Sequence, residues 1–189
     1  MQDTLLPFPF MTLAHHKRCF SLFNARSVGT SRKKTEICNF ITDNDVHIMF
    51  LTETWLRPSG DEAKCADLAP PGYSVHSFPR SPGAASCRGG GIAFIVRDSL
   101  KHNVSCSTSF PFYHSCFEVA QLTLTFHNQR YNFFCIYRPP PNKKNAFTDT
   151  IFLFLYFLFF INSQNSLNTV ILYQAKCLLL AILISTLKP

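Results

Sequence analysis

The word IMFLTETWL, Ile48 to Leu56, is the most informative part of this chain, because an apolar run ends there in an acidic residue. The run from Val46 to Thr52 is nearly continuous, which is typical of a strand buried on both faces of a sheet. Glu53 follows this strand directly. A polar side chain at the carboxyl end of a buried strand lies at a sheet edge, where α/β and sandwich enzymes build their sites.

An earlier apolar run ends in the same way. The word SLFNARSV, Ser21 to Val28, places Asn24 near the end of a strand that we expect over Cys19 to Ala25. Thr30 and Ser31 then offer an N-cap, and apolar residues recur at helical spacing through SRKKTEICNFITDN. We therefore expect a strand followed by a helix and by the buried strand that Glu53 ends.

A third run, FCIYRPPP, places Tyr137 and Arg138 directly before a row of prolines. It ends a strand expected over Tyr131–Tyr137, whose antiparallel partner is expected over Phe117–Phe126 across a short hairpin turn. Between the second and third runs, we expect short strands at Tyr73–Phe78 and Ile92–Val96, with loop elsewhere. The glycines of CRGGG lack the Lys-Ser/Thr pair of a nucleotide-binding loop, so they indicate a flexible lead-in to a strand.

The order and wording of these three words resemble the endonuclease domain of non-LTR retrotransposons, which belongs to the DNase I-like endonuclease/exonuclease/phosphatase superfamily. The resemblance runs from Phe20 to Ser163 and includes APPGYSVHSFPR, CRGGGIAFIVRDSL and NKKNAFTD. It implies an incomplete DNase I-like four-layer α/β sandwich, with the first sheet mostly present and the second largely missing. We divide the chain into a disordered leader (1–18), the domain (19–163) and an apolar tail outside the family (164–189).

The resemblance implies a phosphodiester hydrolase that uses Mg²⁺ and an activated water. Glu53 matches the metal-binding Glu of the family, and Asn24 matches the Asn that helps to hold metal and phosphate. Tyr137 matches the Tyr that contacts the scissile phosphate, and Arg138 is placed to add a phosphate contact. Without the resemblance, Glu53 is more simply a salt-bridge partner in a loop, Asn24 a turn residue and Tyr137 a half-buried aromatic.

Composition is compatible with a nucleic-acid partner but does not require one. The length of 189 residues fits a single domain. The net charge of +7 is compatible with binding to a phosphate backbone, and it equally fits a basic surface that contacts only solvent. Its eight cysteines form no CxxC pair, which indicates free thiols in a reducing compartment rather than a zinc site. Because the start of the chain does not resemble a signal peptide, we expect an intracellular protein, nuclear or cytoplasmic.

Two words of the family do not occur in the chain: Gly-Asp-Phe-Asn, which supplies the general acid, and Ser-Asp-His, which supplies the general base. The residues Lys176 to Leu187 can be encoded by synonymous codons that also carry a second message in another reading frame. Read from the third base of the first codon, those codons give VFIIGDFNIHI, which contains the first of these words. We infer a change of reading frame and predict an inactive fragment. Since such a tail was not selected to pack, a chain ending near Asn162 is expected to fold no worse.

The alternative hypothesis is a non-catalytic remnant that binds nucleic acid or associates with a membrane. A helix expected over Ala146–Ser163 contains IFLFLYFLFFI, which is apolar all round but shorter than the ~20 residues that span a bilayer. The stretch Val170–Leu187 is longer but holds Gln174 and Lys176. We therefore expect DNA, not a membrane, as the partner. A remnant that binds nucleic acid would show salt-dependent DNA binding, and a membrane-associated one would not.

Overall fold

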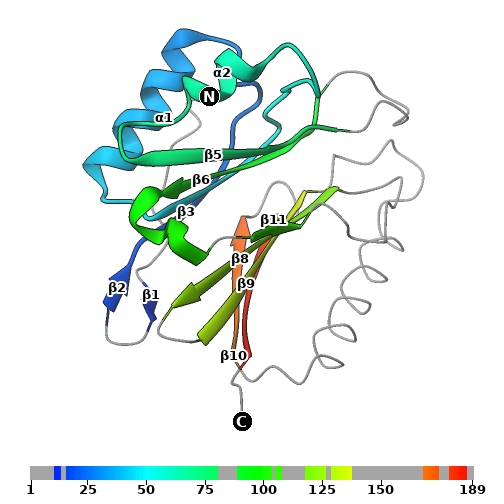
Figure 1. Cartoon of the computed structure of the whole chain (residues 1–189). Coiled ribbons are helices and arrows are strands. Elements are labelled where there is room, and N and C mark those ends of the chain that lie inside the picture. Colours follow the sequence, from blue (N-terminus) through cyan, green and yellow to red (C-terminus); the bar gives the residue numbers. More distant parts are fainter. Residues whose placement is uncertain are drawn as a thin grey trace, which may run out of the picture.

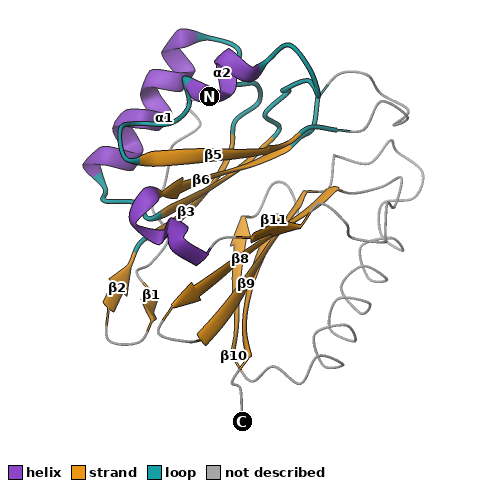
Figure 2. Cartoon of the chain, in the orientation of Figure 1, coloured by secondary structure: helices purple, strands orange, loops and turns teal. Residues whose placement is uncertain are grey.

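Two β-sheets face each other, and two helices cover the outer face of the first sheet (Figures 1 and 2). The layers are therefore helix, sheet and sheet. The computed structural model describes residues 11–13, 16–80, 89–103, 105–107, 118–126, 129–137, 168–174 and 179–186. A mixed first sheet with helices on its outer face gives the α/β character that the sequence predicts, and the arrangement is consistent with a DNase I-like fold.

The first sheet has four strands in the order β3-β4-β6-β5. The first two run parallel, so the carboxyl ends of both lie at the same edge, and Asn24 stands opposite Thr52. The other two neighbouring pairs are antiparallel. All four strands had been expected from the sequence, with ends that differ by at most two residues. Their bounds are β3 Phe20–Asn24, β4 Ile48–Thr52, β5 Tyr73–Phe78 and β6 Ile92–Arg97.

Helix α1, Ser31–Asp43, makes the crossover that two parallel strands require. It begins as the sequence predicts, because the backbone N–H of Lys33 donates to the Thr30 hydroxyl at 3.3 Å. Ile37 and Ile41 are fully buried against the sheet. A second, five-residue helix, α2 (Glu62–Ala66), lies within a segment expected to be only loop.

Alternate residues of β3, β4 and β6 enter two different cores, which explains why these three strands read as continuous apolar runs. One core lies between the two sheets and takes Leu22, Phe50 and Phe94. The other lies under the helices and takes Phe23 and Met49, among others. The first sheet is therefore buried on both faces and forms the rigid part on which the edge residues stand.

The second sheet has five antiparallel strands in the order β10-β11-β9-β8-β7. The expected hairpin of β8 and β9 is its centre, and Leu122, Leu124, Phe133 and Cys135 from it are buried in the core between the sheets. The rings of Phe20 and Phe133 meet edge to face across the sandwich, 5.3 Å apart. The bounds are β7 Ser105–Ser107, β8 Glu118–Phe126, β9 Gln129–Tyr137, β10 Asn168–Gln174 and β11 Leu179–Thr186.

The expectation that the second sheet is largely missing is wrong, because strands of the tail complete it. Strand β11 pairs with β9 from Leu179 opposite Tyr137 to Thr186 opposite Arg130, and β10 pairs with β11. The physical reason is that an apolar, β-branched stretch needs only an open strand edge to complete a ladder of backbone hydrogen bonds. The tail uses the edge of β9 in this way, so its family origin and its packing are separate questions.

The remaining described elements lie outside the two main sheets or at their ends. Within the leader that we expected to be disordered, β1 (Met11–Leu13) and β2 (His16–Arg18) form an antiparallel ribbon. A 3-10 helix, η1 (Asp98–Asn103), follows β6. The helix expected over Ala146–Ser163 lies outside the described residues. Of the helices that the structure does describe, none has the length and apolar character needed to cross a membrane.

Candidate functional site

The predicted site lies at the carboxyl edge of β3 and β4. Asn24 is the last residue of β3 and Glu53 follows the last residue of β4. Beyond the strand ends the two chain segments stay side by side, because Ser27 N–H donates to the Glu53 carbonyl at 2.7 Å and Val28 N–H to the Thr54 carbonyl at 3.1 Å. The parallel pairing thus continues past the sheet and fixes the backbone that carries Glu53.

Tyr137 reaches the same edge from the second sheet. It ends β9, its side chain is buried, and its hydroxyl donates a hydrogen bond to Oε1 of Glu53. Glu53 itself is only partly buried. Two residues that are far apart in sequence therefore meet where the two sheets come together.

Asn24 has an identified local role at this edge. Its Oδ1 accepts a hydrogen bond from the backbone N–H of Arg26 at 3.2 Å, which is the turn geometry expected of a strand-end Asn. Arg138, the fourth residue singled out from the sequence, lies outside the described residues.

The backbone at this edge is strained. Glu53 and Trp55 have φ angles of +52° and +58°, and in the neighbouring loop Arg26 and Ser27 have +46° and +89°. Side chains with a Cβ rarely adopt this region, and each such residue costs about 1–3 kcal/mol. Among the described residues only one other non-glycine residue, Asp45, has a positive φ. Strain concentrated in this way is characteristic of binding and catalytic sites.

The glycine loop that precedes β6 supports the strained segment from the other side. Thr54 N–H donates to the Gly91 carbonyl at 3.2 Å and Trp55 N–H to the Gly90 carbonyl at 2.9 Å. Gly90 has a φ of +78°, and a Cβ there would overlap the carboxylate of Glu118 and the guanidinium of Arg80. These glycines are therefore a fitted close approach between loops, not the flexible lead-in expected from the sequence.

Glu118 makes a second bridge between the sheets beside Tyr137, its cross-strand neighbour on β9. Its Oε1 accepts from the Arg80 guanidinium, and its Oε2 accepts from the backbone N–H of Gly91 at 2.6 Å. Both charged side chains are largely buried, and each is satisfied by the other. Sequence reasoning missed this pair, because its two members are 38 residues apart and Glu118 lies in none of the words that carry the resemblance.

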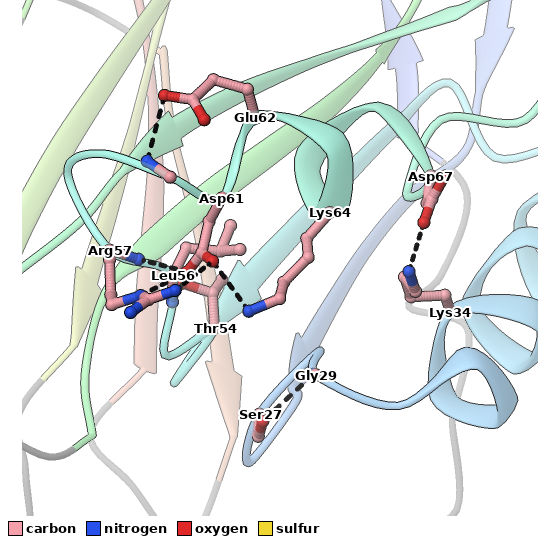
Figure 3. A network of polar contacts seen from close by, with 11 residues as sticks. Ser27, Gly29, Lys34, Thr54, Leu56, Arg57, Asp61, Glu62, Lys64 and Asp67 are labelled. Carbon is pink, nitrogen blue, oxygen red and sulfur yellow. Dashed lines mark hydrogen bonds and ion pairs between the residues drawn. The ribbon is translucent and has the colours of Figure 1, made fainter.

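Asp61 holds the loop that follows Trp55 (Figure 3). Its side chain is only 2% exposed, and it accepts from the Arg57 backbone N–H at 2.9 Å, the Arg57 guanidinium at 3.1 Å and the Lys64 ammonium at 2.7 Å. Hydrogen bonds from Arg57, then from Lys64, hold the pKa of Asp61 well below its usual value. The aspartate therefore stays ionised and closes the loop onto α2.

The oxygen donors at the edge fit one type of metal better than others. No group of three or more His, Cys, Asp or Glu side chains able to enclose a metal occurs among the residues that the structure describes. A carboxylate from Glu53 and an amide oxygen from Asn24 are hard donors on neighbouring chain segments. Mg²⁺ is commonly held by one or two carboxylates and keeps several waters, so this donor set fits Mg²⁺ and does not fit an enclosed zinc or calcium site.

Comparison with known proteins agrees with this geometry. No curated protein matches the chain. The family model described as the endonuclease/exonuclease/phosphatase family matches residues 19–172. The match begins just before β3, includes the whole candidate edge with Glu118 and Tyr137, and ends within β10. Because it spans most of the chain, this protein belongs to the endonuclease/exonuclease/phosphatase family.

Proposed function

We propose that the Glu53 edge is the metal- and phosphate-binding part of an Mg²⁺-dependent DNA endonuclease site. Family membership gives a nuclease- or phosphatase-type hydrolase whose relatives typically depend on a divalent metal. The observation that carries the proposal is the hydrogen bond from Tyr137 to Glu53, which joins the two sheets at a strained edge. The bond holds the carboxylate of a residue with a positive φ, and strain of this kind persists only where the surrounding structure maintains it.

Each residue has a defined task in this proposal. Glu53, with Asn24, would hold Mg²⁺, which supplies charge stabilisation to the phosphate and lowers the pKa of a water. Tyr137 orients the Glu53 carboxylate through the bond that the structure contains. Its hydroxyl carries a single proton, so a bond to a phosphate oxygen would replace the bond to Glu53. Arg138, the next residue, is assigned to a second phosphate oxygen, where a guanidinium bonds in a fork.

DNA is the proposed substrate, and target-site nicking in retrotransposition is the proposed biological reaction. Support comes from the wording TETWL and YRPPP, which resembles the endonucleases of non-LTR retrotransposons, and from the net charge of +7. A positive surface favours a phosphate backbone through counterion release. A nuclease acting on duplex DNA gains both affinity and orientation from such contacts.

The chain of 189 residues contains neither Gly-Asp-Phe-Asn nor Ser-Asp-His, so the proposed general acid and base are not part of it. We attribute this to a change of reading frame within the tail. The family match supports the inference because it ends at residue 172, just before Lys176 to Leu187, whose codons can spell the first word in another frame. Genomic DNA around the Tyr173 codon tests it: a single frame that encodes the tail without any hidden word would overturn it.

Metal binding tests the proposed site without requiring catalysis. Mn²⁺, a spectroscopic substitute for Mg²⁺, should bind the full chain with about one equivalent of Glu53-dependent signal by electron paramagnetic resonance. Glu53→Gln should abolish this binding, whereas Glu36→Gln should not, since Glu36 lies on α1 and pairs with Arg32 on the helix surface. Equal Mn²⁺ binding in both variants would overturn the proposal that Glu53 binds the metal.

Nicking of supercoiled plasmid tests the proposed loss of activity. Removing members of a hydrolytic constellation commonly costs several orders of magnitude in rate, so we expect no nicking by the chain above the level of its Glu53→Ala variant. Nicking by the chain that disappears in Glu53→Ala would show that the site is complete. DNA binding that weakens steeply with salt, without cleavage, supports the second candidate function, a non-catalytic nucleic-acid-binding protein.

A further inference from the structure

Trp55 differs from the other large apolar side chains in its exposure to solvent. It is 49% exposed, and among the side chains that the structure describes it is the only large hydrophobic one in that class. Its two neighbours, Thr54 and Leu56, are both buried. The segment therefore turns one indole outward between two anchored residues, directly after the proposed metal-binding Glu53.

The outward orientation is imposed by the surrounding backbone. Trp55 has a φ of +58° and its N–H is held by the Gly90 carbonyl at 2.9 Å. Gly89 lies against the indole, because a Cβ on this glycine would come within 3.6 Å of the indole Nε1. A glycine at that point leaves bare backbone under one side of the ring. About half of the residue, 49%, meets solvent.

Exposure and strain both work against this arrangement in the isolated protein. A flexible loop would relax the φ angle of Trp55 and bury the indole. The contacts of Asp61 with Arg57 and Lys64, which we call the Asp61 clamp, prevent this. They fix the backbone of Arg57, which lies two residues after Trp55. A preorganised, half-exposed aromatic ring is the feature that binds a flat ligand with little loss of conformational freedom.

We propose that Trp55 stacks on an unpaired nucleobase of the nucleic acid whose phosphate lies at the Glu53 edge. This inference rests on the proposed function and adds the contact that recognises the base. Residues two apart in an extended chain lie at most about 7 Å from each other, so one nucleotide can place its phosphate at Glu53 and its base at Trp55. Stacking on an indole accepts any base and needs it out of the helix, so the ligand is single-stranded or locally opened DNA.

The chain contains one tryptophan, so its fluorescence reports on this residue alone. We would titrate the full chain with a short single-stranded oligonucleotide in EDTA and follow the emission. The expected result is saturable quenching that a blunt duplex of the same length produces only weakly. An abasic oligonucleotide of equal length and charge is the matched control, and it should bind without quenching.

Variants separate stacking from electrostatic attraction. Trp55→Ala should weaken binding of the single strand about tenfold, and Trp55→Phe should restore part of the loss, because a smaller ring still stacks. The affinity for the abasic oligonucleotide should not change in either variant. Trp55 is exposed and lies outside both cores, so circular dichroism should show that both variants fold.

The outcomes distinguish this inference from the proposed function. Equal quenching by the abasic and the intact oligonucleotide, or binding of the intact strand without quenching, would overturn stacking while leaving Glu53-dependent Mn²⁺ binding in place. Base-dependent quenching together with Mn²⁺ binding that ignores Glu53→Gln would support stacking and overturn the metal site. Quenching that persists in Glu53→Gln and is absent with the abasic strand supports the inference.

Discussion

The two ends of the four-stranded sheet use polar residues for opposite purposes. At the amino end of β4, Arg97 ends β6 and donates to Asp45 and to the Tyr73 hydroxyl. Tyr73 in turn donates to the Val46 carbonyl at 2.7 Å. These polar groups connect β4, β5 and β6 to one another, and together they close this end of the sheet.

At the carboxyl end the polar groups connect strained loops. Glu53 holds Tyr137 across the sandwich, Glu118 holds Arg80 and Gly91, and Trp55 is turned to solvent. The same sheet supports both ends, so the difference does not come from the quality of its core. The amino end joins its strands through paired polar groups, whereas the carboxyl end holds most of the strained residues at some cost in stability.

Removing the tail should have the largest effect, because it acts on the sheet that brings Tyr137 to the site end. Without residues after Asn162, β9 loses its β11 partner, and the first pair of that ladder joins Leu179 to Tyr137. An unpaired apolar strand edge also favours association. We expect the shortened chain to lose its cooperative thermal transition or most of its soluble fraction, measured beside the full chain.

This expectation reverses the one drawn from the sequence, in which the tail was dispensable. A shortened chain with an unchanged thermal midpoint and equal solubility would restore the earlier view. In that case the pairing of β11 with β9 contributes little to stability. The comparison between the amino and carboxyl ends then depends only on contacts of the four-stranded sheet.

A matched pair of substitutions compares the two ends directly. Tyr73→Phe removes a hydroxyl that donates to Val46 and accepts from the charged Arg97, so we expect a loss of about 1–3 kcal/mol in the free energy of unfolding. Tyr137→Phe removes the bond to the partly buried Glu53 carboxylate, which water can reach, and should cost about 0.5–1.5 kcal/mol. Urea unfolding at neutral pH measures both.

Metal binding supplies the second half of that comparison. Tyr137→Phe frees the Glu53 carboxylate and should change the Mn²⁺ affinity, whereas Tyr73→Phe, at the far end of the sheet, should leave it unchanged. If Tyr73→Phe is the variant that alters metal binding, or if Tyr137→Phe is the more destabilising, the assignment of one end to stability and the other to function is wrong.

Much of the first sheet could be predicted from the sequence, because its signals are local. Continuous apolar runs mark β3, β4 and β6, and Thr30 marks the start of α1. The meeting of Glu53 and Tyr137 followed from strand ends together with the family resemblance. These features depend on periodicity and on the order of elements, which a single sequence contains.

The remaining features depend on contacts between distant segments. The Arg80–Glu118 pair and the buried Asp61 look like ordinary surface charges in the sequence. Positive φ angles at Glu53 and Trp55 have no signal of their own, since neither residue type favours them. The tail was misjudged because its departure from the family wording was taken to mean that it could not pair with β9.

The Asp61 clamp should contribute less than the tyrosine at the amino end. Asp61→Asn keeps the shape of the side chain and an oxygen for the Arg57 N–H, while its charged partners, Arg57 and Lys64, are exposed enough for water to replace the aspartate. The pKa of Asp61 is lowered by folding, so its stabilisation is present above the usual aspartate value and is lost as pH falls below it. The variant should show a modestly lower thermal midpoint at pH 7 and approach the unsubstituted chain in acid.

Trp55 fluorescence checks whether the clamp has the role assigned to it. If Asp61 holds the loop after Trp55, Asp61→Asn should shift the emission of this single tryptophan at pH 7. An unshifted emission together with an unchanged midpoint would mean that the loop is fixed by other contacts, such as the hydrogen bond between Trp55 and Gly90.

The smallest expected effect is a pH dependence at the amino end, and it concerns His47. This side chain is buried, and its Nδ1 accepts a hydrogen bond from the Cys19 N–H at 3.3 Å, so the ring is neutral in the fold. Burial, followed by the positive charges of Arg97 and Arg18, lowers the pKa of His47, although Asp45 opposes this.

Because the unfolded chain binds a proton at His47 more readily than the folded one, stability should fall as pH drops below the ordinary histidine pKa of about 6.5. The fall should stop once pH passes the lowered pKa of the folded state. His47→Gln has no titrating ring, so its thermal midpoint should change less between pH 7.5 and about 5.5. The quantity to measure is the difference between the two midpoint curves, which cancels the carboxylates shared by both chains. Parallel curves would mean that His47 is solvated or already charged in the fold, and the amino end would then lack the closed, dry packing that distinguishes it from the Glu53 edge.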